Sequence, residues 1–133
     1  MGINDFSLRV VGCYYDNPDG SSRQAEIANC WPGEVVELYR EPDNPHDPSA
    51  VAVFSRRGVQ VGYLGKDRCG WIGSKIDRKY EIHAIVERVL GATLPGSTLG
   101  LIIRLNMEGD KPDLDVRPRF GSNPAFAVQR VHF

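Results

Sequence analysis

The chain has 133 residues, of which 41% are hydrophobic, and its formal net charge is −1. A chain of this length can bury one hydrophobic core but not two. The nearly neutral charge argues against a strong nonspecific binder of nucleic acid, because affinity of that kind comes from many contacts between cations and phosphates. This charge is compatible with a binding site that depends on a few local contacts.

The N-terminal part of the chain predicts two β-strands separated by a turn. Residues 6–15 alternate in the manner of a strand, with Leu8 and Val10 on one face. The turn is the Pro-Asp-Gly-Ser-Ser sequence of residues 18–22. Residues 34–40 then form the second predicted strand.

A β-hairpin is predicted next. Residues 50–54 and 59–63 are both rich in β-forming side chains, and the sequence Ser-Arg-Arg-Gly connects them. Gly58 can supply the positive φ that such a connection needs. We expect Arg56 and Arg57, at the hairpin tip, to be an ordinary solvated surface.

One helix is predicted over residues 67–76, with Asp67 as its N-cap. Trp71 is expected to be a core residue. The apolar face of this helix is expected to consist of Cys69, Ile72 and Ile76.

Two longer strands are predicted over residues 80–90 and 98–105, joined as a hairpin that could close a β-barrel. The β-type region therefore covers residues 1–107. Residues 108–133 are polar and punctuated by prolines, and they are expected to be a C-terminal extension that is partly disordered or packed on the barrel. The apolar anchors of this extension are Phe120, Phe126, Val128, Val131 and Phe133.

The most distinctive motif is a proline-rich loop between two predicted strands. Pro42, Pro45 and Pro48 each fix their own φ and push the preceding residue toward an extended conformation. His46 and Asp47 are therefore held on a stiff loop, which loses little entropy when a ligand binds it. A stiff loop that holds a base and a carboxylate is a candidate binding site.

Two interpretations of this loop are open. An ionised Asp47 accepts hydrogen bonds only, so it suits a hydroxyl or amine donor and repels phosphate, while His46 offers a flat ring. Alternatively, Asp47 caps the turn by accepting backbone N–H groups and His46 simply covers the loop. Tyr63, Lys66 and Arg68 follow the second strand of the hairpin. An aromatic face with two cations would suit the end of a single nucleic-acid strand.

The chain resembles the HIRAN domain family in three segments that occur in the family's order. These segments are Val-Val-Gly at residues 10–12, the sequence VELYREPDNPHDPSAV at residues 36–51, and Val-Gly-Tyr-Leu-Gly-Lys at residues 61–66. The family occurs at the N-terminus of fork-remodelling helicases of the SWI/SNF type and as free-standing proteins in bacteria and phages. The resemblance implies a small OB-like or SH3-like β-barrel of about six strands with one or two short helices. It also implies binding of single-stranded DNA at a free 3′-hydroxyl end, with a role in DNA repair and with a helicase or nuclease as a further partner.

The resemblance also implies roles for four residues. His46 stands at an aromatic position of the family and would stack on the terminal nucleotide less strongly than a tyrosine. Asp47 would accept a hydrogen bond from the 3′-hydroxyl, which explains why such a site would reject a 3′-phosphate. Tyr63 stands where members place a polar ring, and Lys66 would contact the terminal phosphodiester.

Further contacts are implied near the first strand and on a later loop. Members can show Arg-Tyr where this chain has Tyr14 and Tyr15, so Tyr15 keeps the stacking ring while Tyr14 replaces a basic partner. That departure removes one phosphate contact. For the later aromatic contact, Phe126 has a suitable local sequence, whereas the family's topology favours the neighbourhood of Leu94.

The cysteines favour a reducing compartment. Cys13, Cys30 and Cys69 are odd in number and widely spaced, which favours buried thiols acting as small apolar side chains. No secretory signal and no membrane-length apolar run is evident, so we expect a cytoplasmic protein without a membrane partner. No Cys-x-x-Cys motif and no histidine spacing suggests a zinc site, and no cofactor is expected.

Three functions compete at this stage. The first is a noncatalytic module that binds DNA ends. The second is a hydrolase of nucleotides or phosphodiesters with His46 as base and Asp47 as its orienting partner, although neighbours along an extended turn point to opposite sides. The third is a protein-interaction domain that keeps the barrel without DNA binding. The Asp47→Ala variant separates them, since it should abolish end preference, turnover or neither.

Overall fold

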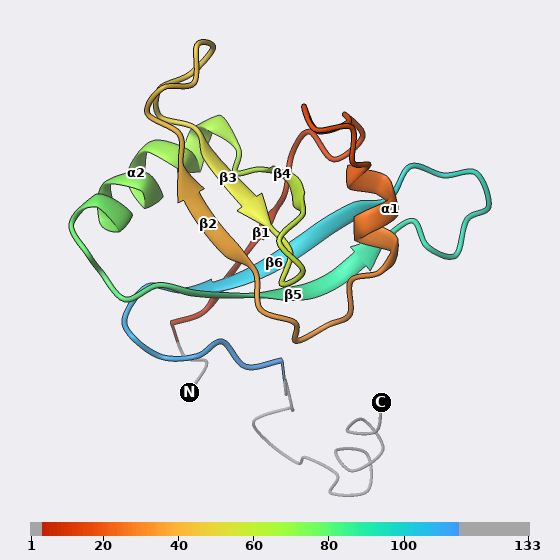
Figure 1. Cartoon of the computed structure of the whole chain (residues 1–133). Coiled ribbons are helices and arrows are strands. Elements are labelled where there is room, and N and C mark those ends of the chain that lie inside the picture. The colour runs from red at the N-terminus through yellow and green to blue at the C-terminus, as the bar shows by residue number, and fades with distance from the viewer. Residues whose placement is uncertain (1–3, 115–133) are drawn as a thin grey trace, which may run out of the picture.

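A computed structural model describes residues 4–114 of the chain. Within this part, the chain forms six strands and two helices (Figure 1). The predicted mainly-β class with short helices is therefore confirmed. In chain order the elements are β1 (Phe6–Arg9), α1 (Arg23–Ala28), β2 (Glu37–Arg40), β3 (Val51–Phe54), β4 (Gln60–Tyr63), α2 (Lys66–Asp77), β5 (His83–Leu90) and β6 (Gly100–Asn106).

The six strands form two antiparallel sheets of three strands each, in the orders β1-β6-β5 and β2-β3-β4. Both predicted hairpins are confirmed, as the pairs β3-β4 and β5-β6. Single bridges link the two sheets, one from Val11 to Tyr63 and one from Val35 to Ile85. The described residues show no closed barrel, so the barrel itself stays a prediction.

The core lies between the two sheets. Val51 and Val53 of β3 have no exposed surface, and Leu101, Ile103 and Leu105 of β6 are equally buried. The β6 residues are spaced by two, which places all three on the same face of their sheet. The predicted single core is thus built from strand alternation, and all three cysteines are buried, as predicted.

The first strand is shorter than predicted, because it ends at Arg9 rather than at residue 15. The chain leaves its own sheet at Val11, which pairs with Tyr63 of the other sheet. It then reverses in a turn, closed by a 3.3 Å hydrogen bond from the amide of Tyr15 to the carbonyl of Gly12. This turn puts both tyrosines on a loop.

Helix α1 was not predicted from the sequence. Its N-cap is Ser22, whose hydroxyl accepts a 3.1 Å hydrogen bond from the amide of Ala25. Ile27 is fully buried and anchors the helix to the core. Six residues are too few to show the helical period in the sequence, so Ser22 was the available signal.

Helix α2 confirms the predicted element but corrects two details. Its N-cap is Gly65, without a side-chain cap, while Asp67 is exposed in the first turn. Trp71 is 47% exposed rather than buried in the core, and its ring packs against Phe6 with centroids 5.7 Å apart. No helix in the described part is long and apolar enough to cross a membrane. The predicted buried face is confirmed at Cys69 and Ile72.

The hairpin tip between β3 and β4 is more than a solvated surface. Gly58 has the expected positive φ of 81°. Arg57 donates to the Glu26 carboxylate at 2.6 Å and to both oxygens of Glu34 at 3.0 Å. These hydrogen bonds tie the hairpin to α1 and to the segment before β2. Arg56 forms an ion pair with Glu34 at 3.3 Å, and its side chain is exposed, as predicted.

We expect Arg57→Ala to lower the free energy of unfolding by about 2 kcal/mol, because it leaves the nearly buried Glu26 carboxylate without its partner. Arg56→Ala, the matched control, should cost at most about 0.5 kcal/mol, since its side chain is 62% exposed. Urea denaturation of both variants measures the difference. The hydrogen bonds from Arg57 also lower the pKa of Glu34, so this stabilisation is lost as the pH falls through the folded-state pKa. Equal stability of the two variants would contradict this role of Arg57.

Candidate nucleic-acid interface

Three segments meet at one end of the molecule. They are the loop of residues 41–50 between β2 and β3, the loop of residues 10–22 after β1, and the connection from β4 to α2 (Figure 1). Tyr63 joins them, because its amide and carbonyl exchange hydrogen bonds of 2.9 and 2.8 Å with Val11. The two loops project from the fold on either side of this junction.

The side chain of Tyr63 links the loops a second time. Its hydroxyl donates to one carboxylate oxygen of Glu41 at 2.9 Å. That carboxylate oxygen also accepts a hydrogen bond from the side-chain NH2 group of Asn44 at 3.0 Å. Arg23 lies over the Tyr63 ring at 5.4 Å and donates to the carbonyl of Gly12. Tyr63 therefore has a positioning role here, and its half-buried ring is held in place by both loops.

Asn44 organises the proline-rich loop from within. Its side-chain oxygen accepts hydrogen bonds from the backbone N–H groups of His46 and Asp47, at 2.8 and 3.1 Å. The amide of Glu41 donates to the carbonyl of Ala50 and closes the loop at its base. The sequence predicts this side-chain-to-backbone turn at Asn44, and the structure confirms it. The contribution of Glu41 was not predicted from the sequence.

Asp47 fits the turn-capping interpretation, and its ligand-binding role stays a prediction. One carboxylate oxygen accepts the Ser49 N–H at 2.9 Å, so the turn-capping role is confirmed. Among the described residues, the donor nearest to the other oxygen is the weakly donating thiol of Cys69 in α2, 4.0 Å away. The half-buried carboxylate is thus fixed in direction and retains accepting capacity. His46, beside it, is exposed.

Tyr14 and Tyr15 form an exposed aromatic pair on the opposite loop. Their side chains are 63% and 58% exposed, and their ring centroids are 4.4 Å apart with 33° between the planes. A hydrogen bond of 3.3 Å joins the two hydroxyls and raises the pKa of Tyr14 above its usual value. Both rings offer exposed faces on which a base can stack.

Three predicted contact residues remain, namely Lys66, Leu94 and Phe126. Lys66 is the exposed first residue of α2, directly after the β4 connection. Leu94 is 63% exposed on the β5-β6 loop, and the end of that loop shares a shallow pocket with residues 9–14. Phe126 lies outside the described residues.

The His, Cys, Asp and Glu side chains in residues 4–114 are candidates for metal binding or catalysis. No group of three or more His, Cys, Asp or Glu side chains is placed there to hold a metal ion. Burial raises the pKa of Cys13, and it raises that of Cys30 to about 11, so neither thiol is set up as a nucleophile. His46 and Asp47 share no hydrogen bond between their side chains among those found in the described part.

Solved structures of similar fold come from two sources. The chain is similar to the crystal structure of the HIRAN domain of human HLTF, with 26% identity, a TM-score of 0.57, and coverage of 77% of this chain and 73% of that one. It is also similar to the HLTF HIRAN domain solved by NMR in its DNA-bound conformation, with 25% identity, a TM-score of 0.53, and coverage of 78% and 74%. A Lactobacillus plantarum protein shares the fold, with 20% identity, a TM-score of 0.56, and coverage of 77% and 98%.

Curated relatives are similar over a shorter stretch. The helicase-like transcription factors of Oryctolagus cuniculus and Homo sapiens are 44% and 41% identical to this chain over 46 residues. That stretch is 35% of this chain and 5% of the length of each relative. Residues 3–99, which carry both loops, α1, β1 to β5 and α2, match the HIRAN domain as a family. The chain belongs to the HIRAN domain family.

Proposed function

We propose that this chain is a noncatalytic DNA-binding module that recognises single-stranded DNA at its free 3′-hydroxyl end. The observation that carries the proposal is the Asp47 carboxylate, which is held by Ser49 through one oxygen while the other keeps accepting capacity. A terminal hydroxyl can donate to that oxygen, whereas a terminal phosphate would meet negative charge. The DNA-bound conformation of the similar HLTF domain supports DNA as the class of ligand.

The two loops supply complementary parts of such a site. The Tyr14 and Tyr15 rings offer a surface for base stacking on one side of the junction. Lys66 offers one charge for a phosphodiester at the start of α2. The Asp47 carboxylate on the other loop then accepts a hydrogen bond from the terminal 3′-hydroxyl. Each group binds or positions, and none has the paired geometry that proton transfer from a nucleophile to a general base requires.

The direct test is fluorescence anisotropy at a stated low salt concentration. It uses a 5′-labelled single strand ending in a 3′-hydroxyl and the same strand ending in a 3′-phosphate. We expect at least tenfold tighter binding of the hydroxyl end. Equal binding would mean generic single-strand contact and would overturn end recognition. Binding to neither strand would favour the protein-interaction alternative.

A weak salt dependence should accompany this binding. Contacts to about two phosphates give a slope of log K against log salt near −1.4 for a single strand. Lys66→Ala should flatten that slope by about 0.7, because it removes one phosphate contact. Lys111→Ala, which removes an exposed lysine remote from the junction, should leave the slope unchanged. A slope steeper than about −4 would point to a broad electrostatic surface instead.

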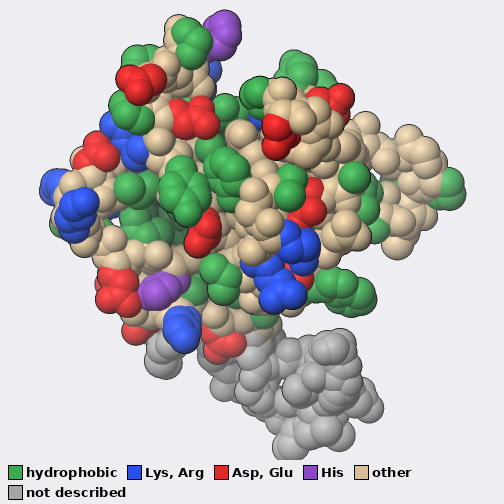
Figure 2. Space-filling model, in the orientation of Figure 1, with side chains coloured by type: hydrophobic (Ala, Val, Ile, Leu, Met, Phe, Trp, Pro, Cys, Tyr) green, Lys and Arg blue, Asp and Glu red, His purple; other side chains and the backbone are tan. Residues whose placement is uncertain are grey.

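Figure 2 shows why a broad electrostatic surface is not expected. Basic and acidic side chains are interspersed over the face it displays, with apolar side chains between them. The nearly neutral total charge agrees with this mixture. Cytoplasmic location remains a prediction from the cysteines and the apolar pattern. A part in DNA repair and a helicase or nuclease as partner remain predictions from the resemblance.

A further inference from the structure

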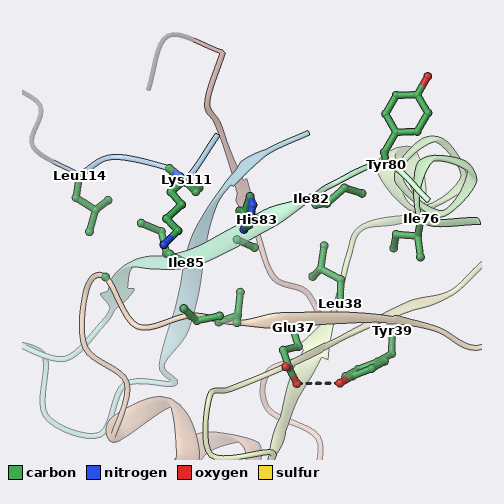
Figure 3. Close-up of a pocket in the computed structure, with 15 residues that line it drawn as sticks. Glu37, Leu38, Tyr39, Ile76, Tyr80, Ile82, His83, Ile85, Lys111 and Leu114 are labelled. Carbon is green, nitrogen blue, oxygen red and sulfur yellow. Dashed lines mark hydrogen bonds between the residues drawn. The ribbon is translucent and has the colours of Figure 1, made fainter. Parts of the chain in front are cut away.

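A groove of about 690 Å³ lies between the two sheets (Figure 3). The residues that line it belong to neither of the loops that carry Tyr14 and Asp47. Leu38 and Ile82 form part of its apolar wall. Three of its lining side chains are large, apolar or aromatic, and strongly exposed. They are Val35 at 57%, Tyr39 at 50% and Tyr80 at 43%.

The edges of two strands border this groove. β2 pairs with β3, and its other edge has no neighbouring strand in the described part. The other edge of β5 is occupied at residues 84 and 86, which exchange hydrogen bonds with the segment of residues 33–36, and is without a neighbouring strand elsewhere in the described part. The sheets touch at the bridge between Val35 and Ile85, where the amide of Val36 donates to the carbonyl of Ala84 at 3.0 Å. Beyond this bridge the strands belong to separate sheets. Unpaired strand edges beside apolar side chains fit an extended segment of chain.

The chain itself leads into this groove. Lys111, Pro112 and Leu114 line it, and Figure 3 shows Lys111 and Leu114 beside Ile85. Leu114 is the last described residue, so 19 residues of sequence begin at the groove wall. A tethered segment has an effective concentration on the order of millimolar, which a free partner rarely reaches in solution.

We propose that residues 115–133 of this chain occupy the groove, with residues 126–133 extended in it. The latter sequence, Phe-Ala-Val-Gln-Arg-Val-His-Phe, has two apolar pairs whose members are spaced by two, Phe126 with Val128 and Val131 with Phe133. The pairs lie on opposite faces of an extended strand, so one pair faces the apolar wall. The 12 residues from position 114 to 126 reach up to about 40 Å when extended, so length does not limit the docking. This proposal does not depend on DNA binding.

The test uses the full chain with a nitroxide label on Gln129→Cys, which keeps the apolar residues of the segment. The native thiols are buried, so labelling selects the new cysteine. We expect paramagnetic broadening of the backbone amide NMR signals of residues 35–39 and 82–85. Signals of residues 12–15 and 44–47 should stay sharp. Uniformly sharp signals in the groove would overturn the proposal.

A matched pair of variants checks that the groove wall holds the segment. In the labelled chain, Val35→Glu should reduce the broadening at least threefold, because it puts a charge on the apolar wall. Leu94→Glu, a similar change at a 63% exposed leucine outside the groove, should leave it unchanged. A mixture of spin-labelled chains and ¹⁵N chains without label tests for a second copy as the occupant. Broadening that persists in the mixture would overturn the intramolecular proposal.

Discussion

Asp47→Asn is expected to abolish the preference for a 3′-hydroxyl over a 3′-phosphate. Asparagine keeps a side-chain oxygen that can accept the Ser49 N–H, so the loop should retain its shape. The change removes the negative charge and replaces the free acceptor oxygen by an NH2 donor, so the hydrogen bond from the hydroxyl is lost and the repulsion of the phosphate ends. A charged hydrogen bond contributes about 1.5–3 kcal/mol, so affinity for the hydroxyl strand should fall about tenfold or more.

The measurement is the anisotropy titration of both strands with this variant and with Asp43→Asn. Asp43 lies on the same loop and is exposed, so its substitution makes the same change in net charge. We expect Asp43→Asn to keep the end preference within about twofold of the native value, as an exposed charge outside the contact should. A similar loss in both variants would show that loop charge, rather than the Asp47 oxygen, sets the preference.

The local parts of the fold could be predicted from the sequence. The strands β3 and β4, with the turn at Gly58, follow from β-rich runs and a glycine, which are signals within a few residues. The stiff loop around Asp47 follows from its prolines in the same way. Helix α1 could not be predicted, because its burial depends on Ile27 meeting a core formed by distant strands.

The site was predicted in part, for a similar reason. The capping by Asp47 is a local property that the sequence indicates. The exposure of Tyr14 and Tyr15 was not predicted, because these residues were assigned to the end of the first strand. The bond from Tyr63 to Glu41 spans 22 positions and depends on how the strands assemble. Long-range side-chain pairs of this kind have no signature in a single sequence, and so Tyr63 was assigned to the ligand rather than to the support of the loop.

Gly62→Ala is expected to destabilise the fold by about 3 kcal/mol, the largest effect among the stability variants. A Cβ at this position would collide with the backbone oxygen of Val11 and lie 2.6 Å from a methyl group of Val10. Backbone cannot move aside as a flexible side chain can. The bridge between Val11 and Tyr63 would therefore have to open.

Urea denaturation measures this effect, with Gly70→Ala as the matched control. Gly70 lies in α2 with open space around its Cβ position, so alanine there should stabilise the fold by about 0.5–1 kcal/mol. A Gly62→Ala variant within about 0.5 kcal/mol of the native chain would contradict the expected clash.

The same substitution should weaken binding of the DNA end at temperatures where the variant is still folded. The bridge at Val11 sets the distance between the aromatic pair and the Asp47 loop, so opening it separates the two parts of the proposed site. Binding that depends on both parts loses affinity when their spacing is no longer fixed. Folded Gly62→Ala with native end preference would show instead that either loop alone is sufficient to recognise the strand.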